Sequence, residues 1–430
     1  MNWISITFFI IAFLIGCTMF KRGADIISPA RVFGLTWSVV IGLANLKLSR
    51  LQSDWTLSQW IYVLMGPISF LVGLFVTYVM NIGARLHPVD EIRQTLRSQK
   101  INNSKLFYLI ILAFVTYFSG YIVINIVKGP IPIFAVNPSA ARTEFSVFGL
   151  GLFIYNMPIV VFFSLAYHLF VRGNSGRKWI LKIIVFITAI TYLFLLQRYA
   201  LIMISVLMFT LLYYTTRHIR FRTMVLFMML GIFVIYSVAT LRAGKIIQTA
   251  LYVTSEMKFS SQYAIFTEPY MYVVMNVENF VHALSKLEQH TFGYYTFNFI
   301  LALTGLKHWI EGYFGIVDTP YLFSGYNTYT LFWTFYRDFG LLGISLIPIL
   351  LGFFVGSFYY SMRRLPTIER VSFYGIIVFV MGLSFFINLL GFLWFVYIIV
   401  WMVIILKFIR VNSVHDVGNR KVAILGNNVP

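Results

Sequence analysis

Three arginines stand beside long apolar runs and are the strongest candidates for chemistry in this chain: Arg142, Arg198 and Arg242. Arg198 lies in the short polar interruption Gln197-Arg198-Tyr199 between two apolar runs, so its guanidinium must stay near a membrane surface. Guanidinium groups are planar and permanently charged, and they bind phosphate through two parallel hydrogen bonds. Each arginine alone also fits a lipid anchor. Together they predict a diphosphate-binding site, which would stabilise a diphosphate leaving group as its charge develops.

General bases are expected among the acidic and imidazole side chains of the same polar segments. The predicted catalytic carboxylates are Glu268, Glu144 and Asp338. Two of them have a structural alternative, because Glu268 suits a helix N-terminus and Asp338 can pair with Arg337. His282 and His290 could titrate near neutral pH, but they equally fit the surface of interfacial helices.

Aromatic and amide side chains of these segments are candidates for sugar binding. The predicted sugar-binding residues are Tyr270, Tyr326, Asn327 and Arg337. Aromatic faces can stack on the apolar side of a pyranose ring, although tyrosine and tryptophan at this depth also form the belt at a membrane interface. No phosphate-binding loop, dinucleotide fingerprint, zinc-protease motif or nucleophile elbow occurs in a supporting context. We therefore expect no cofactor and no metal.

The composition is that of a membrane protein. The chain has 430 residues, of which 60% are hydrophobic and 11% are charged, whereas soluble domains contain about 25% charged residues. The single cysteine, Cys17, lies inside an apolar run, so neither an intrachain disulfide nor a cysteine metal cluster can form.

Runs of about 20 apolar residues can cross a bilayer as helices, because a helix satisfies its own backbone hydrogen bonds. We predict an all-α polytopic fold with about 11 transmembrane helices. The predicted spans are 3–20, 30–48, 57–83, 106–127, 147–170, 179–197, 199–215, 223–241, 339–361, 371–390 and 392–409. The first run lacks a basic n-region and a small-residue cleavage site, so we expect a retained helix and not a signal peptide.

The net charge of +19 follows the loops, which indicates membrane topology and not a nucleic-acid partner. Alternate loops and the C-terminal tail hold 22 of the 33 Lys and Arg residues, and nine of the fourteen acids lie on the opposite side. The positive-inside rule then places the N-terminus outside and the C-terminus in the cytoplasm.

The spans divide the chain into four parts. Residues 1–241 are expected to form a bundle of eight spans with an outer loop at 128–145, residues 339–410 the last spans, and residues 411–430 a cytoplasmic tail. The long outer segment, 242–338, is too rich in aromatic residues for a linker and is expected to cover a membrane cavity as a lid. Within it we predict interfacial amphipathic helices at 247–263 and 269–287, and an apolar run at 294–306 that lies flat or re-enters.

The order of short motifs resembles that of bacterial O-antigen polymerases, which are membrane glycosyltransferases of the GT-C type. The motifs are 28–37 (SPARVFGLTW), 141–145 (ARTEF), 197–201 (QRYAL), 241–242 (LR), 268–270 (EPY) with Asn276 and Asn279, and 326–329 (YNTY) leading to 337–343 (RDFGLLG). The resemblance covers most of the chain, and the order and loop placement of the motifs match better than any single one.

The resemblance implies a reaction on the outer face of the cytoplasmic (inner) membrane. A growing glycan would move from undecaprenyl diphosphate to the terminal sugar of another lipid-linked repeat unit, in O-antigen, capsule or exopolysaccharide synthesis. The arginines would hold the diphosphate, and no nucleotide would be needed. The implied partners are the undecaprenyl-diphosphate-linked oligosaccharide, the lipid bilayer, and the chain-length regulator and flippase of the same pathway.

Two alternatives stay open. O-antigen ligases, which share this architecture, usually carry a His-Asn pair where this chain has Tyr326-Asn327; the missing histidine disfavours a ligase and leaves the base of the family unassigned. A flippase or transporter of the same lipid-linked oligosaccharide would need polar residues along a whole transmembrane path, and few lie inside the predicted spans.

Overall fold

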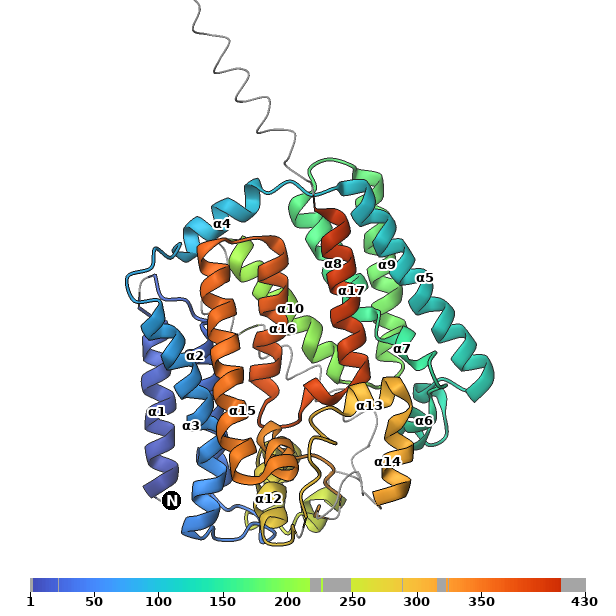
Figure 1. Ribbon diagram of the computed structural model, residues 1–430. Coiled ribbons are helices and arrows are strands. Elements are labelled where there is room, and N and C mark those ends of the chain that lie inside the picture. Colours follow the sequence, from blue (N-terminus) through green and yellow to red (C-terminus); the bar gives the residue numbers. More distant parts are fainter. Residues whose placement is uncertain are drawn as a thin grey trace, which may run out of the picture.

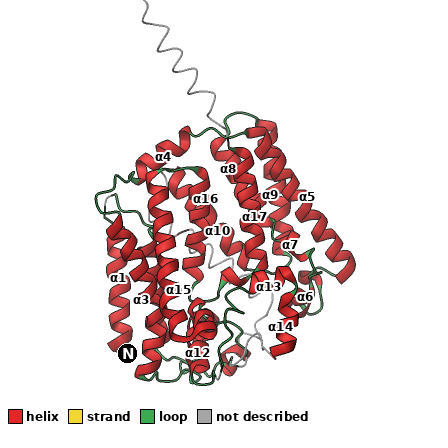
Figure 2. Cartoon of the chain, viewed as in Figure 1, coloured by secondary structure: helices red, strands yellow, loops and turns green. Residues whose placement is uncertain are grey.

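The protein is described here from a computed structural model, whose described residues are 3–21, 23–216, 226, 249–287, 289–314, 322–323 and 325–410. Within these ranges its regular elements are helices (Figure 2). The α-helices are α1 Trp3–Met19, α2 Pro29–Ala44, α3 Leu57–Met80, α4 Val89–Ser98, α5 Asn103–Lys128, α6 Pro138–Glu144, α7 Gly151–Ile154, α8 Met157–Phe170, α9 Ser175–Leu193, α10 Tyr199–Thr215, α12 Thr267–Leu284, α13 Asn298–Thr304, α14 Leu306–Phe314, α15 Leu331–Arg364, α16 Ile368–Leu383 and α17 Leu393–Ile409. The 3-10 helices are η1 Pro132–Phe134, η2 Ser261–Phe266 and η3 Leu389–Gly391. The all-α prediction is confirmed for this part of the chain.

Helices occupy ten of the eleven predicted spans, and the remaining one, 223–241, lies outside the described residues except for residue 226. Four helical stretches are long and apolar enough to cross a membrane: Leu57–Met80, Asn103–Phe134, Gly151–Phe170 and Leu331–Arg364. Shorter apolar helices accompany them, among them α1, α2, α10 and α17. These helices support a membrane protein, and the number of eleven spans stays a prediction.

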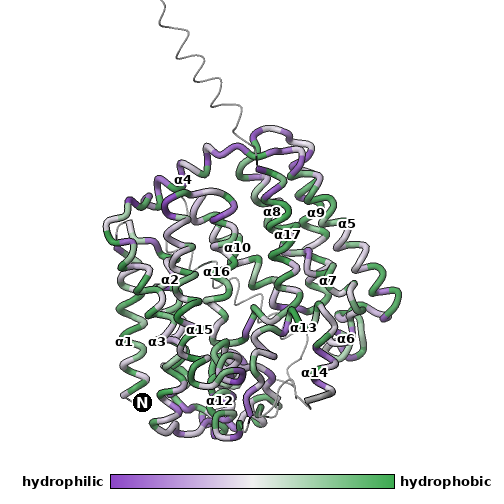
Figure 3. The backbone as a smooth tube through the Cα atoms, in the orientation of Figure 1, coloured by the Kyte–Doolittle hydropathy of each residue, from purple (hydrophilic) through white to green (hydrophobic). Residues whose placement is uncertain are grey.

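The long helices run side by side between two ends of the molecule (Figure 1). The N-terminus, α6, α12, α13 and α14 gather at one end, which we call the α12 end, and α4 covers the opposite α4 end. Hydrophobic residues follow the helices between the ends, and hydrophilic residues concentrate at both (Figure 3). The residues predicted for chemistry that the structure describes therefore belong to the α12 end.

Helices α3 and α15 form the closest long contact in the bundle. A side chain at Gly73 of α3 would collide with the backbone carbonyl of Ile349, and one at Gly352 of α15 with that of Phe70. Small residues let two membrane helices approach to backbone contact in this way. Because α3 belongs to the N-terminal bundle and α15 to the last spans, the two parts pack as one body.

Helix α15 begins earlier than the predicted span. The side chain of Thr330 accepts a hydrogen bond from the backbone of Trp333 at 3.4 Å and caps the helix at Leu331. The helix is then interrupted at Gly340, whose φ of 62° suits glycine. The predicted start at 339 thus marks this kink, and residues 331–339 form a separate short helical segment at the α12 end.

The long outer segment folds differently from the prediction. A helix is present at 267–284 and most of it is buried against α2 and α3, which the predicted amphipathic surface helix at 269–287 did not include; its position at the membrane interface stays a prediction. Its polar residues find partners inside the protein, which a sequence pattern does not show. The described part of 247–263 is helical only at 249–254 and then forms a bridge between Ser49 and Met257 before η2. The run at 294–306 contains α13, which contacts α17.

Candidate functional site at the α12 end

The turn between α9 and α10 carries Arg198. Helix α9 ends at Leu193, the chain reverses through Leu196 with φ 54°, and Arg198 is the residue before α10. Leu195 and Leu196 are almost fully buried, which anchors the turn. The short polar interruption seen in the sequence is therefore a fixed turn that holds one arginine at the end of the bundle.

The loop that carries Arg142 is bound to the same turn. The backbone N–H of Ile133 donates to the carbonyl of Phe194 at 3.1 Å, and the rings of Phe134 and Phe194 meet with centroids 5.5 Å apart. Asn137 then caps α6 by accepting a hydrogen bond from Ala140, and Arg142 lies in the last turn of this short helix. Two segments far apart in the sequence are thus joined next to both arginines.

Arg142 and Arg198 have a common neighbour, Tyr199. Both guanidinium groups lie within electrostatic range of its hydroxyl group, and Arg142 also reaches Tyr155. The structure therefore brings together two of the three predicted arginines. Arg242 lies outside the described residues.

The guanidinium of Arg198 is partly engaged. Its Nη1 donates to Oε1 of Glu268 at 3.1 Å, and the group lies over the ring of Tyr272 at 5.6 Å. Only 12% of the side chain is exposed, and its Nε and Nη2 are buried without a hydrogen-bond partner among the described residues. Nε and Nη2 form the edge of a guanidinium that donates two parallel hydrogen bonds to a carboxylate or phosphate. Buried donors are nearly always paired, so this edge is suited to binding an anionic group.

Glu268 and Tyr272 approach Arg198 from α12. They are four residues apart and so lie on one face of the helix. Glu268 lies in the first turn of α12, where a negative charge interacts favourably with the helix dipole, but its side chain forms no capping hydrogen bond. Its carboxylate instead forms the ion pair with Arg198, so this predicted base is already engaged. The spacing of four was visible in the sequence, whereas the partner was not.

Asp338, the second predicted base, is completely buried and accepts four hydrogen bonds. Its donors are Thr291 Oγ1 at 2.6 Å, Tyr295 N at 3.2 Å, and N and Oγ1 of Thr296, both at 2.6 Å. The carboxylate thus fixes the loop before α13 to the kink of α15. Arg337 is also buried, with its guanidinium over the rings of Tyr295 at 5.2 Å and Trp333 at 5.8 Å.

Glu144, the third predicted base, ends α6 two residues after Arg142. It is exposed, and its carboxylate has no hydrogen-bond or ion-pair partner among the described residues. Of the three predicted carboxylates it is the one available for proton transfer.

The predicted histidines lie elsewhere in the outer segment. His282 packs on the ring of Phe323 with centroids 4.4 Å apart, and partial burial lowers the pKa of its imidazole. Nδ1 of His290 lies 3.3 Å from the backbone oxygen of Arg337.

The predicted sugar-binding residues are only partly accessible. Tyr270 is buried, its hydroxyl accepts from Leu48 N at 3.1 Å and donates to Gln52 Oε1 at 2.7 Å, and burial raises the pKa of this hydroxyl to about 12. The hydroxyl of Tyr326 lies 2.8 Å from Ser255 Oγ, and burial raises its pKa. Asn327 is exposed beside it. Asn327 is therefore the member of the set that is open to a ligand.

A buried ion pair at this end was missed by the sequence reasoning. Nζ of Lys47 lies 2.6 Å from Oε1 of Glu278 and 4.2 Å from the ring centroid of Trp55, whose Nε1 donates to the same carboxylate at 3.1 Å. Burial raises the pKa of the Glu278 carboxyl and lowers that of the Lys47 ammonium. The pair ties the middle of α12 to the loop between α2 and α3.

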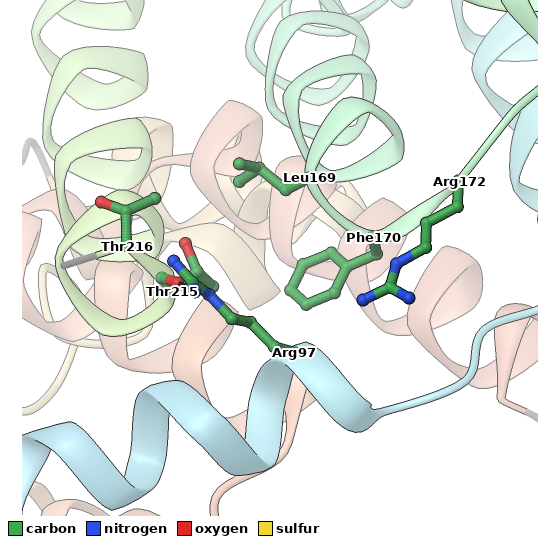
Figure 4. A pocket seen from close by; sticks show the side chains of 6 residues that line it. All are labelled: Arg97, Leu169, Phe170, Arg172, Thr215 and Thr216. Carbon is green, nitrogen blue, oxygen red and sulfur yellow. Dashed lines mark hydrogen bonds between the residues drawn. The ribbon is translucent and has the colours of Figure 1, made fainter. Parts of the chain in front are cut away.

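The α4 end contains a cavity of about 300 Å³ (Figure 4). It is lined by Arg97, Leu169, Phe170, Arg172, Thr215 and Thr216. Nε of Arg97 donates to the carbonyl of Thr215 at 2.9 Å, so this arginine already satisfies the C-terminus of α10. The C-termini of α8 and α10 meet here. None of the residues predicted for chemistry lines this cavity, and those that the structure describes lie at the α12 end.

No protein-family model, curated protein or solved structure matches the chain. The described part of the fold is that of a helical membrane protein, and its α12 end holds the nearly buried, ion-paired side chain of Arg198. Any more specific function must be argued from that site.

Proposed function

We propose that the protein polymerises lipid-linked oligosaccharide repeat units on the outer face of the cytoplasmic membrane. The α12 end would face outward, as the charge distribution of the loops predicts. One observation supports the proposal above all: the buried Nε and Nη2 of Arg198 have no hydrogen-bond partner among the described residues. Arg142 lies near Tyr199, which is also a neighbour of Arg198. A prenyl diphosphate offers pairs of charged oxygens that can accept the two parallel hydrogen bonds of such an edge.

The proposed reaction transfers a glycan between two lipid carriers. The bond from the anomeric carbon of the donor to its diphosphate oxygen breaks, and the electron pair leaves with undecaprenyl diphosphate. A hydroxyl of the acceptor sugar forms the new bond to the same carbon and loses its proton. Arg198 and Arg142 would stabilise the charge that develops on the leaving diphosphate.

We assign the proton acceptor to Glu144. Glu268 and Asp338 are held by Arg198 and by the loop at 291–296, so their carboxylates are engaged. Glu144 is exposed on the helix that carries Arg142, and it would receive the proton of the acceptor hydroxyl.

The test is a reconstituted polymerisation. The purified full-length protein in nanodiscs is incubated with synthetic undecaprenyl-diphosphate repeat units, without nucleotide or ion gradient, and the products are resolved on a gel. We expect a ladder and release of undecaprenyl diphosphate. Arg198→Ala should lower the rate at least about 100-fold, the loss typical for one donor to a developing charge.

The matched control is Arg172→Ala, which removes an exposed arginine at the α4 end and should leave the rate unchanged. An unchanged substrate with folded protein and the cognate repeat unit would contradict the polymerase. Transfer to a lipid A core would indicate a ligase, and movement of intact substrate across the bilayer a flippase.

A further inference from the structure

We infer that Glu268 limits how tightly Arg198 holds a diphosphate and thereby allows the diphosphate to leave after transfer. The inference rests on the proposed phosphate-binding role of Arg198. It concerns the other side of the same guanidinium, where a carboxylate is already bound at 3.1 Å.

The geometry separates the two contacts of the guanidinium. Glu268 holds Nη1, whereas Nε and Nη2 form the edge that remains for a ligand. Glu268 and the ring of Tyr272 both come from α12 and together fix the plane of the guanidinium. A phosphate can therefore bind while Glu268 stays in place.

The charge of Glu268 opposes such a ligand. The carboxylate and the bound phosphate would lie on opposite sides of one guanidinium, and like charges at this separation repel. The side chains of Arg198 and Glu268 are only 12% and 19% exposed, so salt and water screen this repulsion weakly. Glu268 consequently orients the arginine and at the same time lowers its affinity for an anion.

Weak product binding has a use in the proposed reaction. An arginine that binds the diphosphate equally well before and after bond cleavage does not accelerate the chemical step. It only slows release of undecaprenyl diphosphate, which must leave before the next repeat unit binds. Glu268 is thus a positioning residue that favours turnover.

Two substitutions separate orientation from charge. Glu268→Gln keeps the shape and still accepts a hydrogen bond from Nη1, but it removes the negative charge. Glu268→Ala removes both. We expect Glu268→Gln to bind inorganic pyrophosphate about tenfold more tightly than the wild type, which corresponds to about 1.4 kcal/mol. The affinity of Glu268→Ala for pyrophosphate should lie between those of the wild type and Glu268→Gln, because Arg198 is no longer held in place in this variant.

The measurement is calorimetric titration of the full-length protein in nanodiscs with inorganic pyrophosphate. Glu91→Gln, which neutralises an exposed glutamate on α4, is the matched control and should bind like the wild type. In the polymerisation assay, Glu268→Gln should keep the rate of a single transfer and lose several-fold in multiple turnover, a split that general misfolding would not cause.

Each outcome decides one of the two ideas. Tighter binding by Glu268→Gln, or by Glu268→Ala if the first variant fails to fold, supports the inference. Equal or weaker binding by these variants, while Arg198→Ala loses binding, overturns the inference and leaves the anion site standing. Equal binding by the wild type and Arg198→Ala, or no binding by any variant, overturns the proposed site itself.

Discussion

Arg198 shows how much a single side chain can indicate when its hydrogen bonds are counted. Its position between two apolar runs was visible in the sequence, but an arginine there equally fits a lipid anchor. A lipid anchor would reach out to the headgroups, whereas this side chain is nearly buried, ion-paired at Nη1 and, at Nε and Nη2, without a hydrogen-bond partner in the described part of the chain. The burial favours a ligand-binding role.

The fork of Arg198 leads to a prediction about its replacement by another cation. Arg198→Lys keeps a positive charge near Glu268 but offers a point charge in place of two parallel donors. We expect the polymerisation rate to fall by about tenfold or more, which corresponds to the loss of one charged hydrogen bond. The measurement is the initial rate of ladder formation at equal protein level, and full activity of the lysine variant would show that bidentate geometry is not required.

The two carboxylates Asp338 and Glu144 should behave in opposite ways. Asp338→Asn exchanges one acceptor oxygen for an amide that faces donors, so about 2–4 kcal/mol of stability should be lost. Glu144 is exposed and its carboxylate makes no hydrogen bond or ion pair with the described residues, so Glu144→Gln should leave thermal unfolding unchanged while turnover falls. Thermal unfolding in nanodiscs and the polymerisation rate check both predictions. A destabilised Glu144→Gln, or a stable but inactive Asp338→Asn, would instead give Glu144 the structural role and Asp338 the role of proton acceptor.

At the scale of elements, α12 organises the site through three contacts along its length. In the first, Glu268 and Tyr272 meet Arg198. In the second, Glu278 pairs with Lys47. In the third, Asn279 Nδ2 donates to the carbonyl of Thr328 at 2.9 Å and holds the loop before α15. The helix therefore positions the arginine, the loop after α2 and the start of α15 at once.

These contacts show which features of the fold and the site could be predicted from the sequence. The apolar runs fix the helices, since the length needed to cross a membrane is a local property, and α10 was predicted at its observed bounds, 199–215. The burial of α12 could not be predicted, because Lys47 and Glu278 are 231 residues apart and each alone resembles a surface charge. The engagement of Asp338 was hidden for the same reason, since its donors come from 291–296.

The ion pair between Lys47 and Glu278 gives a prediction for α12. Lys47→Met alone leaves Glu278 buried without its cation and should cost about 3–5 kcal/mol, and Glu278→Met alone should cost a similar amount. The double variant removes both charges and should recover most of this loss. The measurement is a double-mutant cycle of thermal unfolding. Additive losses in the double variant would show that the two charges do not act as a pair.

At the scale of the whole molecule, the site depends on helices from both ends of the chain. Arg142 and Arg198 come from the N-terminal helices, and α15 follows the long outer segment that provides Glu268. The close contact between α3 and α15 joins these parts. The arrangement of the α12 end should therefore be sensitive to the packing of helices far from any ligand.

Gly73 tests this dependence. In Gly73→Ala the new methyl group would meet the backbone carbonyl of Ile349, so the two helices must separate, at a cost of about 1–3 kcal/mol. The control is Gly16→Ala in α1, where an added Cβ meets nothing within 4 Å and the helix should gain up to about 1 kcal/mol. We expect Gly73→Ala to unfold at lower temperature and also to bind pyrophosphate more weakly, because the shift of α15 is transmitted to α12 through the contact between Thr328 and Asn279. A destabilised Gly73→Ala with unchanged pyrophosphate affinity would show instead that α12 and the arginines form a unit independent of the α3–α15 contact.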